Sequence, residues 1–243
     1  MQNRKNIKKL ISKSKTELNK KPAVKVVPVN HDDDITVIIV DKQFDFDNQE
    51  GSLYVKGGEN LNKPIINYVK NNQKKISQII FTRDWHTSKD KSFSVNGGQW
   101  PNHCEQGTPG AQINKELYDE LSKFGITINI FDKGTDPNHE EYGAFEQCTT
   151  FHHLHPNDKP SVKNCYFKNF DSSSGVRIIN ENLVVCGIAG DYCVKETILT
   201  LIKHWRKFKI SVLMDGVASI DDGTTLNEVI ESHNLQKVYG IVH

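Results

Sequence analysis

Six short apolar runs recur along the chain. They are rich in Val, Ile and Leu and nearly continuous, a pattern typical of strands that are buried on both faces of a parallel sheet. The runs cover residues 35–41, 78–82, 126–131, 183–186, 210–214 and 238–242, the last being the weakest. We therefore expect six parallel strands.

Helical patterns separate these runs, so strands and helices alternate along the chain. The predicted helices cover residues 60–75, 112–123, 191–206 and 224–233. In the third helix Val194, Ile198, Leu201, Ile202 and Trp205 recur at spacings of three and four, which gives one apolar stripe. Such alternation predicts an α/β fold with right-handed crossovers and a ligand site beyond the carboxyl ends of the strands.

Length and charge favour one large domain preceded by a basic extension. The chain has 243 residues and a net charge of +1, but residues 1–30 carry nine basic side chains against Glu17 alone. We expect a flexible extension over 1–30 and a single domain over 31–243. A targeting or nucleic-acid role of the extension has only its charge behind it, and no apolar run is long enough to span a membrane.

Cysteine usage indicates a reducing compartment. The five cysteines, an odd number, are Cys104, Cys148, Cys165, Cys186 and Cys193, and no signal-peptide pattern accompanies them. We therefore expect free thiols and a cytoplasmic protein, with a nuclear location as the alternative if the basic extension acts as a signal.

A reactive cysteine is predicted where residues 183–197 pass from strand to helix. The run breaks at small residues and resumes as a helix with Cys193 in its first turn, where the helix dipole should ease ionisation of the thiol. The alternative is a buried, inert cysteine. Backbone N–H groups of Ala189 and Cys193 are candidates for an oxyanion hole.

Asp41 ends the first predicted strand, and Lys133 follows the third. A carboxylate can serve the thiol as a base, and an ammonium can stabilise the thiolate. With Cys193 they suit acyl transfer on an amide, although a turn cap and a solvated strand end are the alternatives for Asp41 and Lys133.

Asp84, His86 and His103 form a second candidate set. Asp84 and His86 are two residues apart, so an extended backbone directs both to one side. One carboxylate and two imidazoles suit Zn²⁺, Mn²⁺ or Fe²⁺, with ordinary polar loop contacts as the alternative.

The region 148–175 is irregular and is predicted to be an inserted surface loop. It contains His152, His153 and His155, whose spacing is poor for a metal site and favours a solvated loop.

Several motifs in order carry a resemblance to a known family. They are VDKQFDF at 40–46, GSLYVKGG at 51–58, TRDWH at 82–86, WPNHCEQGTPGA at 100–111, FDKGTD at 131–136, EEYGAF at 140–145 and VCGIAGDYCV at 185–194. The sequence resembles the isochorismatase-like cysteine hydrolases and, through DWH and PNHC, their metal-containing nicotinamidase branch.

This resemblance implies a three-layer αβα fold with a six-stranded parallel sheet, and the hydrolysis of nicotinamide to nicotinate and ammonia for NAD salvage. It implies catalytic roles for Asp41, Lys133 and Cys193 and ligation of one divalent metal, in the first place zinc, by Asp84, His86 and His103. It also implies a ring pocket beside a cis peptide, with walls and contacts from Phe46, Trp100, Tyr142, Ile188 and Ala189. It is compatible with a homo-oligomer.

The sequence departs from the family pattern at a few positions. Thr87 and Asp90 stand where the family often has Pro and a second His, and Gly143 follows Tyr142 where Ser is usual. Two other functions stay open: an amidase of the same superfamily that acts on carbamoyl or ureido substrates, and a catalytically silent binding protein.

Overall fold

Six parallel strands form the central sheet of the computed structural model, which describes residues 33–146, 166–168, 175–204 and 208–241. The strand order is β3-β2-β1-β6-β7-β8. The strands are β1 (Ile35–Val40), β2 (Ile76–Asp84), β3 (Thr127–Lys133), β6 (Asn182–Ile188), β7 (Lys209–Ala218) and β8 (Gln236–Val238). The switch in strand order between β1 and β6 places a crevice at their carboxyl ends, as expected for such sheets.

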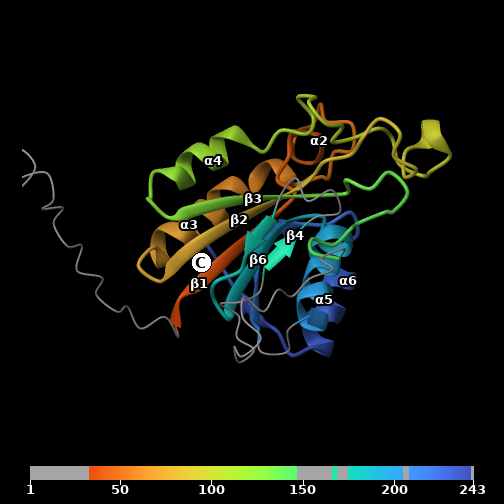
Figure 1. Ribbon diagram of the computed structural model, residues 1–243. Helices are drawn as coiled ribbons and strands as arrows, with labels where there is room; N and C mark the ends of the chain where they lie inside the picture. The colour runs from red at the N-terminus through yellow and green to blue at the C-terminus, as the bar shows by residue number, and fades with distance from the viewer. Residues whose placement is uncertain (1–32, 147–165, 169–174, 205–207, 242–243) are drawn as a thin grey trace, which may run out of the picture. The chain divides into compact units, whose positions relative to one another are not determined.

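Helices cover both faces of the sheet, so the predicted three-layer αβα architecture is confirmed (Figure 1). The helices α3 (Asn62–Asn72) and α4 (Lys115–Ser122) lie on one face, and α5 (Lys195–His204) and α6 (Thr224–Ser232) lie on the other. Shorter turns are α2 (Phe44–Asp47), η2 (Gly58–Asn60), η3 (Ser94–Asn96) and η5 (Gly190–Val194), the last a single π-helical turn.

Alternate residues of the strands supply two separate hydrophobic cores. In β1, Val37 and Ile39 pack with α3 and α4, whereas Ile38 and Val40 pack with α5 and α6. All four are fully buried. This two-sided burial explains why the strands read as continuous apolar runs in the sequence.

The last strand lies earlier than predicted: β8 spans Gln236–Val238, not 238–242. The chain leaves the sheet because the backbone N–H groups of Gly240 and Ile241 donate to the Asp215 carboxylate at 2.8–3.1 Å. The Asp215 carboxylate thus ends the strand. The residue types within the apolar run gave no sign of this, because Asp215 lies elsewhere in the sequence.

The prediction of a surface loop over 148–175 is wrong at its end. The strands β4 (Tyr166–Lys168) and β5 (Gly175–Arg177) pair antiparallel, and Phe167 is buried with its ring 4.9 Å from that of Phe145. Three-residue strands are too short to show a period. The His152, His153 and His155 cluster, Cys148, Cys165 and residues 1–30 lie outside the described residues.

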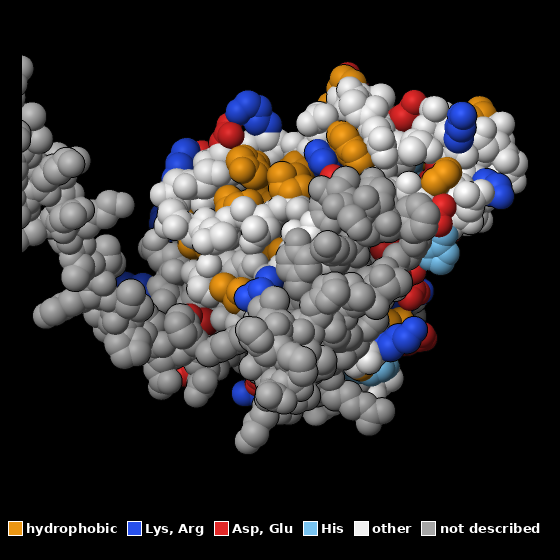
Figure 2. Space-filling view, viewed as in Figure 1, with side chains coloured by type: hydrophobic (Ala, Val, Ile, Leu, Met, Phe, Trp, Pro, Cys, Tyr) orange, Lys and Arg blue, Asp and Glu red, His pale blue; other side chains and the backbone are white. Residues whose placement is uncertain are grey.

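Among the described residues, the mixed surface charge and the free thiols are those expected from a near-neutral sequence with an odd number of cysteines. On the face shown in Figure 2, their acidic and basic side chains are interspersed rather than gathered by sign. Within the described ranges, no helix combines the length and apolarity needed to cross a membrane. Cys104, Cys186 and Cys193 are buried and free.

Gly187 permits the close approach of β6 to β1 beside the crevice. It has a left-handed φ of 118°, and a Cβ added to it would stand 2.0 Å from the Val40 carbonyl oxygen. Gly57 has a similar φ of 91°, but a Cβ there meets nothing within 4 Å. A comparison of alanine substitutions at the two positions therefore distinguishes the cost of backbone strain from the cost of a steric clash.

We expect Gly187→Ala to lower the free energy of unfolding by about 3 kcal/mol or more, because strain and a backbone clash add. Gly57→Ala should cost only about 1–2 kcal/mol, from backbone strain alone. Urea denaturation of both variants measures the difference. Equal losses would show that the β1–β6 contact adjusts freely.

Candidate active site

Asp41, Lys133 and Cys193 meet in the crevice at the carboxyl ends of β1, β3 and β6. The Lys133 Nζ lies 2.9 Å from Asp41 Oδ2 and 3.7 Å from Cys193 Sγ. All three side chains are buried. The polar strand ends that the sequence suggested are therefore in mutual contact.

The Asp41 carboxylate is held in place by the neighbouring strand. Asp41 has a left-handed φ of 47°, a conformation that Asp tolerates better than most residues. Its Oδ1 accepts a hydrogen bond of 2.7 Å from the Thr82 hydroxyl. Its Oδ2 faces Lys133, and one of its carboxylate oxygens lies within 4.8 Å of the Cys193 sulfur.

The nucleophile turn follows β6 directly. The Ile188–Ala189 peptide is cis, as the family resemblance implied. The carbonyl oxygen of Ala189 then accepts hydrogen bonds from the N–H groups of Tyr192 and Val194, at 3.1 and 3.0 Å. This closes the π-helical turn on which Cys193 is carried into the crevice.

The pKa values oppose the expectation that Cys193 ionises easily. Burial, with the charges of Asp41 and Asp84, raises the pKa of the Cys193 thiol well above its usual value, and Lys133 only partly offsets this. Burial also raises the pKa of Asp41 to about 6. The thiol thus keeps its proton beside a carboxylate that is ionised at neutral pH, which is the state in which Asp41 can act as a base.

Asp84, His86 and His103 also come together, at the end of β2 and in the loop beyond it. The Nε2 atoms of His86 and His103 lie 3.7 and 3.9 Å from Asp84 Oδ2. The three ligand atoms fall within 4.8 Å of one another, and all three residues are buried.

The hydrogen bonds of the two imidazoles fit a metal site. His86 Nδ1 lies 2.9 Å from Asp90 Oδ2, and His103 Nδ1 lies 2.8 Å from the Pro101 carbonyl oxygen. Each Nδ1 faces an acceptor and so carries the hydrogen, which leaves Nε2 to bind a metal. The donor set of one carboxylate and two such imidazoles therefore suits a divalent cation.

The charge state of each imidazole differs. Burial lowers the pKa of His103, which is neutral and ready to ligate. For His86 burial acts in the same direction, but Asp84 and Asp90 outweigh it and raise its pKa to about 10. A cation that binds there must therefore displace a proton from His86.

One carboxylate connects the two sets. Asp84 Oδ1 lies 2.5 Å from Lys133 Nζ, while its Oδ2 faces the two imidazoles. Burial alone would raise the pKa of Asp84, but Lys133 and then His86 outweigh it, and the pKa is lowered. Asp84 is therefore ionised and available on both sides.

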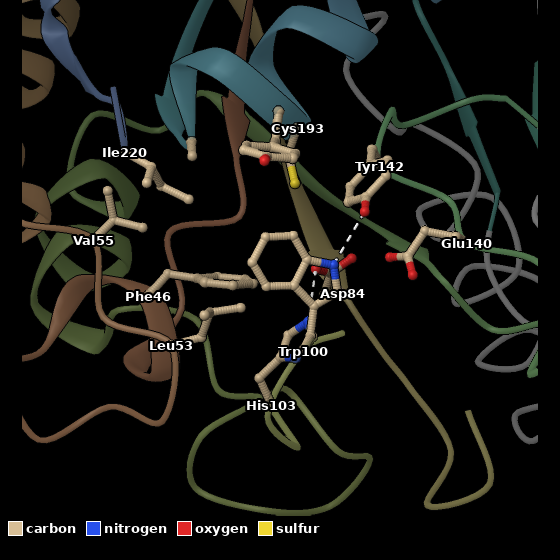
Figure 3. A pocket seen from close by; sticks show the side chains of 12 residues that line it. Phe46, Leu53, Val55, Asp84, Trp100, His103, Glu140, Tyr142, Cys193 and Ile220 are labelled. Carbon is tan, nitrogen blue, oxygen red and sulfur yellow. Dashed lines mark hydrogen bonds and ion pairs between the residues drawn. The ribbon is translucent and has the colours of Figure 1, made fainter. Parts of the chain in front are cut away.

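A pocket opens onto both sets, and Figure 3 shows its lining. The residues around it are Phe46, Leu53, Val55, Asp84, Trp100, His103, Glu140, Tyr142, Ala189, Tyr192, Cys193 and Ile220. The Trp100 indole N–H donates to the Tyr142 hydroxyl at 3.0 Å. Ile188 does not belong to the lining, because its side chain packs against Gly58.

The curated proteins that match this chain are nicotinamidases or nicotinamidase/pyrazinamidases. No family model matches the chain. A nicotinamidase/pyrazinamidase of Mycobacterium tuberculosis is 30% identical over 193 residues, which cover 78% of this chain and 89% of that protein. The chain belongs to the nicotinamidase/pyrazinamidase family.

Solved structures of this family match the fold. A zinc complex of Pyrococcus horikoshii pyrazinamidase has a TM-score of 0.64 at 29% identity, covering 84% of this chain and 98% of that one. Yeast nicotinamidase bound to the inhibitor nicotinaldehyde has a TM-score of 0.63 at 28% identity, covering 84% and 99%.

Two departures from the nicotinamidase pattern have local explanations. A Cβ on Gly143 would stand 2.7 Å from the backbone of Glu196, so the serine that is usual in the family does not fit here. Asp90 replaces a family histidine and contacts His86 directly.

Sequence reasoning missed Gln43. Its buried side chain donates to the carbonyl oxygen of Asp84 and accepts from the N–H of Asp84, both at 2.8 Å. Gln43 therefore fixes the backbone of the shared carboxylate. A buried amide in the run VDKQFDF was the available signal, because such a group needs partners.

Asp45 and Glu140 were missed as well. The Asp45 carboxylate accepts from the N–H groups of Cys104 and Ser52, at 2.7 and 3.1 Å, and so holds the loop that carries His103. Glu140 lines the pocket, and no spacing in the sequence assigns it there.

Proposed function

We propose that this protein is a nicotinamidase that converts nicotinamide to nicotinate and ammonia, a step that returns nicotinamide to NAD synthesis. One observation carries the proposal: the nucleophile group of Cys193, Lys133 and Asp41 adjoins the group of Asp84, His86 and His103 through the contact between Lys133 and Asp84. Members of both groups, Cys193, Asp84 and His103, line one pocket with aromatic walls. The curated relatives and the structure that holds nicotinaldehyde support the same substrate.

In the first half of the reaction, the Cys193 sulfur attacks the amide carbon. Its proton passes to Asp41, whose carboxylate lies near the thiol, and Lys133 stabilises the sulfur as charge develops. Backbone N–H groups of Ala189 and Cys193 are proposed to bind the oxyanion. Asp41 then gives the proton to the amide nitrogen, the C–N bond breaks, and ammonia leaves a thioester.

The second half releases the acid. Asp41 takes a proton from water, the oxygen attacks the thioester carbon, and the C–S bond breaks. The sulfur regains a proton and nicotinate departs. Asp41 is suited to both halves because its pKa of about 6 lies near neutral pH.

The second group orients the ring in this proposal. A divalent cation held by Asp84, His86 and His103, with zinc as the first choice, supplies a Lewis acid for the pyridine nitrogen. The aromatic side chains of Phe46 and Trp100 enclose the flat ring, and the hydrogen bond between Trp100 and Tyr142 holds the indole in place. Buried free thiols are typical of a reducing compartment, so we infer a cytoplasmic protein.

The second candidate, an amidase for carbamoyl or ureido substrates, would need only the thiol, lysine and carboxylate. The Asp/His/His group favours nicotinamide over such substrates, because these lack a ring nitrogen for the cation to bind.

We expect purified protein with Zn²⁺ to release ammonia from nicotinamide and from pyrazinamide, which shares the ring nitrogen. Cys193→Ala should abolish the activity, by about 10⁴-fold or more, because the covalent route has no substitute. Cys186→Ala is the matched control, since this thiol is also buried but lies in the core. Coupled ammonia assays measure all three proteins.

Absence of ammonia release by the metal-loaded protein would contradict the proposed function. Elemental analysis that finds no bound metal in the purified protein would favour the carbamoyl or ureido amidase instead.

The pH profile should show an acidic limb set by Asp41. The pKa of Asp41 is raised, so the base is lost on acidification and recovered as pH rises through about 6. We expect kcat/KM to fall about tenfold per pH unit below that value. A limb that begins near pH 4, the usual range of aspartate, would show that Asp41 is not the base.

A further inference from the structure

We propose that Asp90 is a positioning residue that fixes His86 as an Nε2 ligand for the metal and strengthens that ligand. The inference rests on the metal site of the proposed function and adds to it a residue outside the ligand set.

The contact between Asp90 and His86 determines which ring nitrogen keeps its hydrogen when a metal binds. Asp90 follows His86 by four residues and is 1% exposed, so water does not compete for its carboxylate. Its Oδ2 lies 2.9 Å from His86 Nδ1. An ionised carboxylate only accepts hydrogen bonds, so the hydrogen must sit on Nδ1. The other nitrogen, Nε2, is then directed at Asp84 Oδ2.

The Asp90 carboxylate is itself held on several sides. Its Oδ1 accepts a hydrogen bond of 2.9 Å from the N–H of Ser92. Its own N–H donates to the carbonyl oxygen of Thr87 at 3.0 Å, and its carbonyl oxygen accepts from the Asn96 side chain at 2.8 Å. The acceptor therefore has a fixed position before any metal binds.

The His86 ring is enclosed around this hydrogen bond. Gly134 lies so close that a Cβ on it would stand 2.5 Å from the ring carbon Cε1. Phe93 meets the ring edge-on, with the centroids 5.5 Å apart. Packing thus restricts the ring, and Asp90 selects its tautomer.

The two imidazoles of the site are not equivalent. The Nδ1 hydrogen of His103 is accepted by a neutral carbonyl oxygen, that of Pro101, whereas that of His86 is accepted by a carboxylate. A charged acceptor increases the electron density on the ring and makes Nε2 the stronger donor. We therefore assign a larger share of the metal affinity to His86.

The test measures metal binding without reference to catalysis. The dissociation constant of Zn²⁺ is obtained by competition with a chromophoric chelator for wild type, Asp90→Ala, Asp90→Asn and Asp215→Asn. Asp215 is a matched control, because its carboxylate also accepts backbone N–H groups but outside the pocket. The visible absorption of the Co²⁺-substituted proteins reports the ligand field.

We expect Asp90→Ala to weaken Zn²⁺ binding about 10- to 100-fold, the range found when the hydrogen-bond partner of a metal-bound histidine is lost. Asp90→Asn should lose less Zn²⁺ affinity, since its amide oxygen can still accept the hydrogen bond from His86 Nδ1. Its cobalt absorption band should still shift relative to wild type. Asp215→Asn should keep the affinity and the spectrum of wild type.

Unchanged affinity and an unchanged cobalt band in both Asp90 variants would overturn the inference while leaving the proposed function intact. If Asp90→Ala does not fold, a wild-type result for Asp90→Asn overturns it equally. Failure of the wild type to bind Zn²⁺ or Co²⁺ would overturn both the inference and the proposed metal site.

Discussion

The Asp84 carboxylate is the constraint on which the site depends, because its two oxygens serve two different groups. One oxygen contacts Lys133, which also contacts Asp41 and Cys193; the other faces His86 and His103. On the nucleophile side, two carboxylates face one ammonium. Burial, together with the charges of Asp41 and Asp84, keeps the thiol protonated. On the imidazole side, the charge of Asp84 favours a divalent cation.

The sheet supplies the geometry that this sharing requires. Parallel register places Asp84 directly opposite Lys133, and β1 lies between β2 and β6, so Asp41 stands between the metal ligands and the nucleophile turn. Gln43 then fixes the Asp84 backbone and Asp45 fixes the loop of His103. The positions of the active-site side chains thus depend on Gln43 and Asp45, buried polar residues whose side chains form hydrogen bonds within the protein.

Much of this could be predicted from the sequence, for physical reasons. Strands that are buried on both faces need apolar residues throughout, so they appear as apolar runs in the sequence. The carboxyl ends of parallel strands lie at one edge of the sheet, so the polar residues there, Asp41, Asp84 and Lys133, lie close together. The easier ionisation expected for Cys193 was wrong, since the helix dipole is local whereas burial and two carboxylates act together. The role of Asp90 and the end of β8 at Asp215 depend on single tertiary contacts, which leave no periodic signal.

The central claim is that a metal and the nucleophile occupy opposite sides of Asp84. An anomalous-difference map at the zinc edge, from crystals of the wild-type protein grown with Zn²⁺, tests it most directly. We predict one peak at about 2.0–2.2 Å from Asp84 and from the Nε2 atoms of His86 and His103. A peak on the alternative group of Asp41, Asp84 and Cys193, which also lies within 4.8 Å, would contradict the account, because the metal would then occupy the nucleophile.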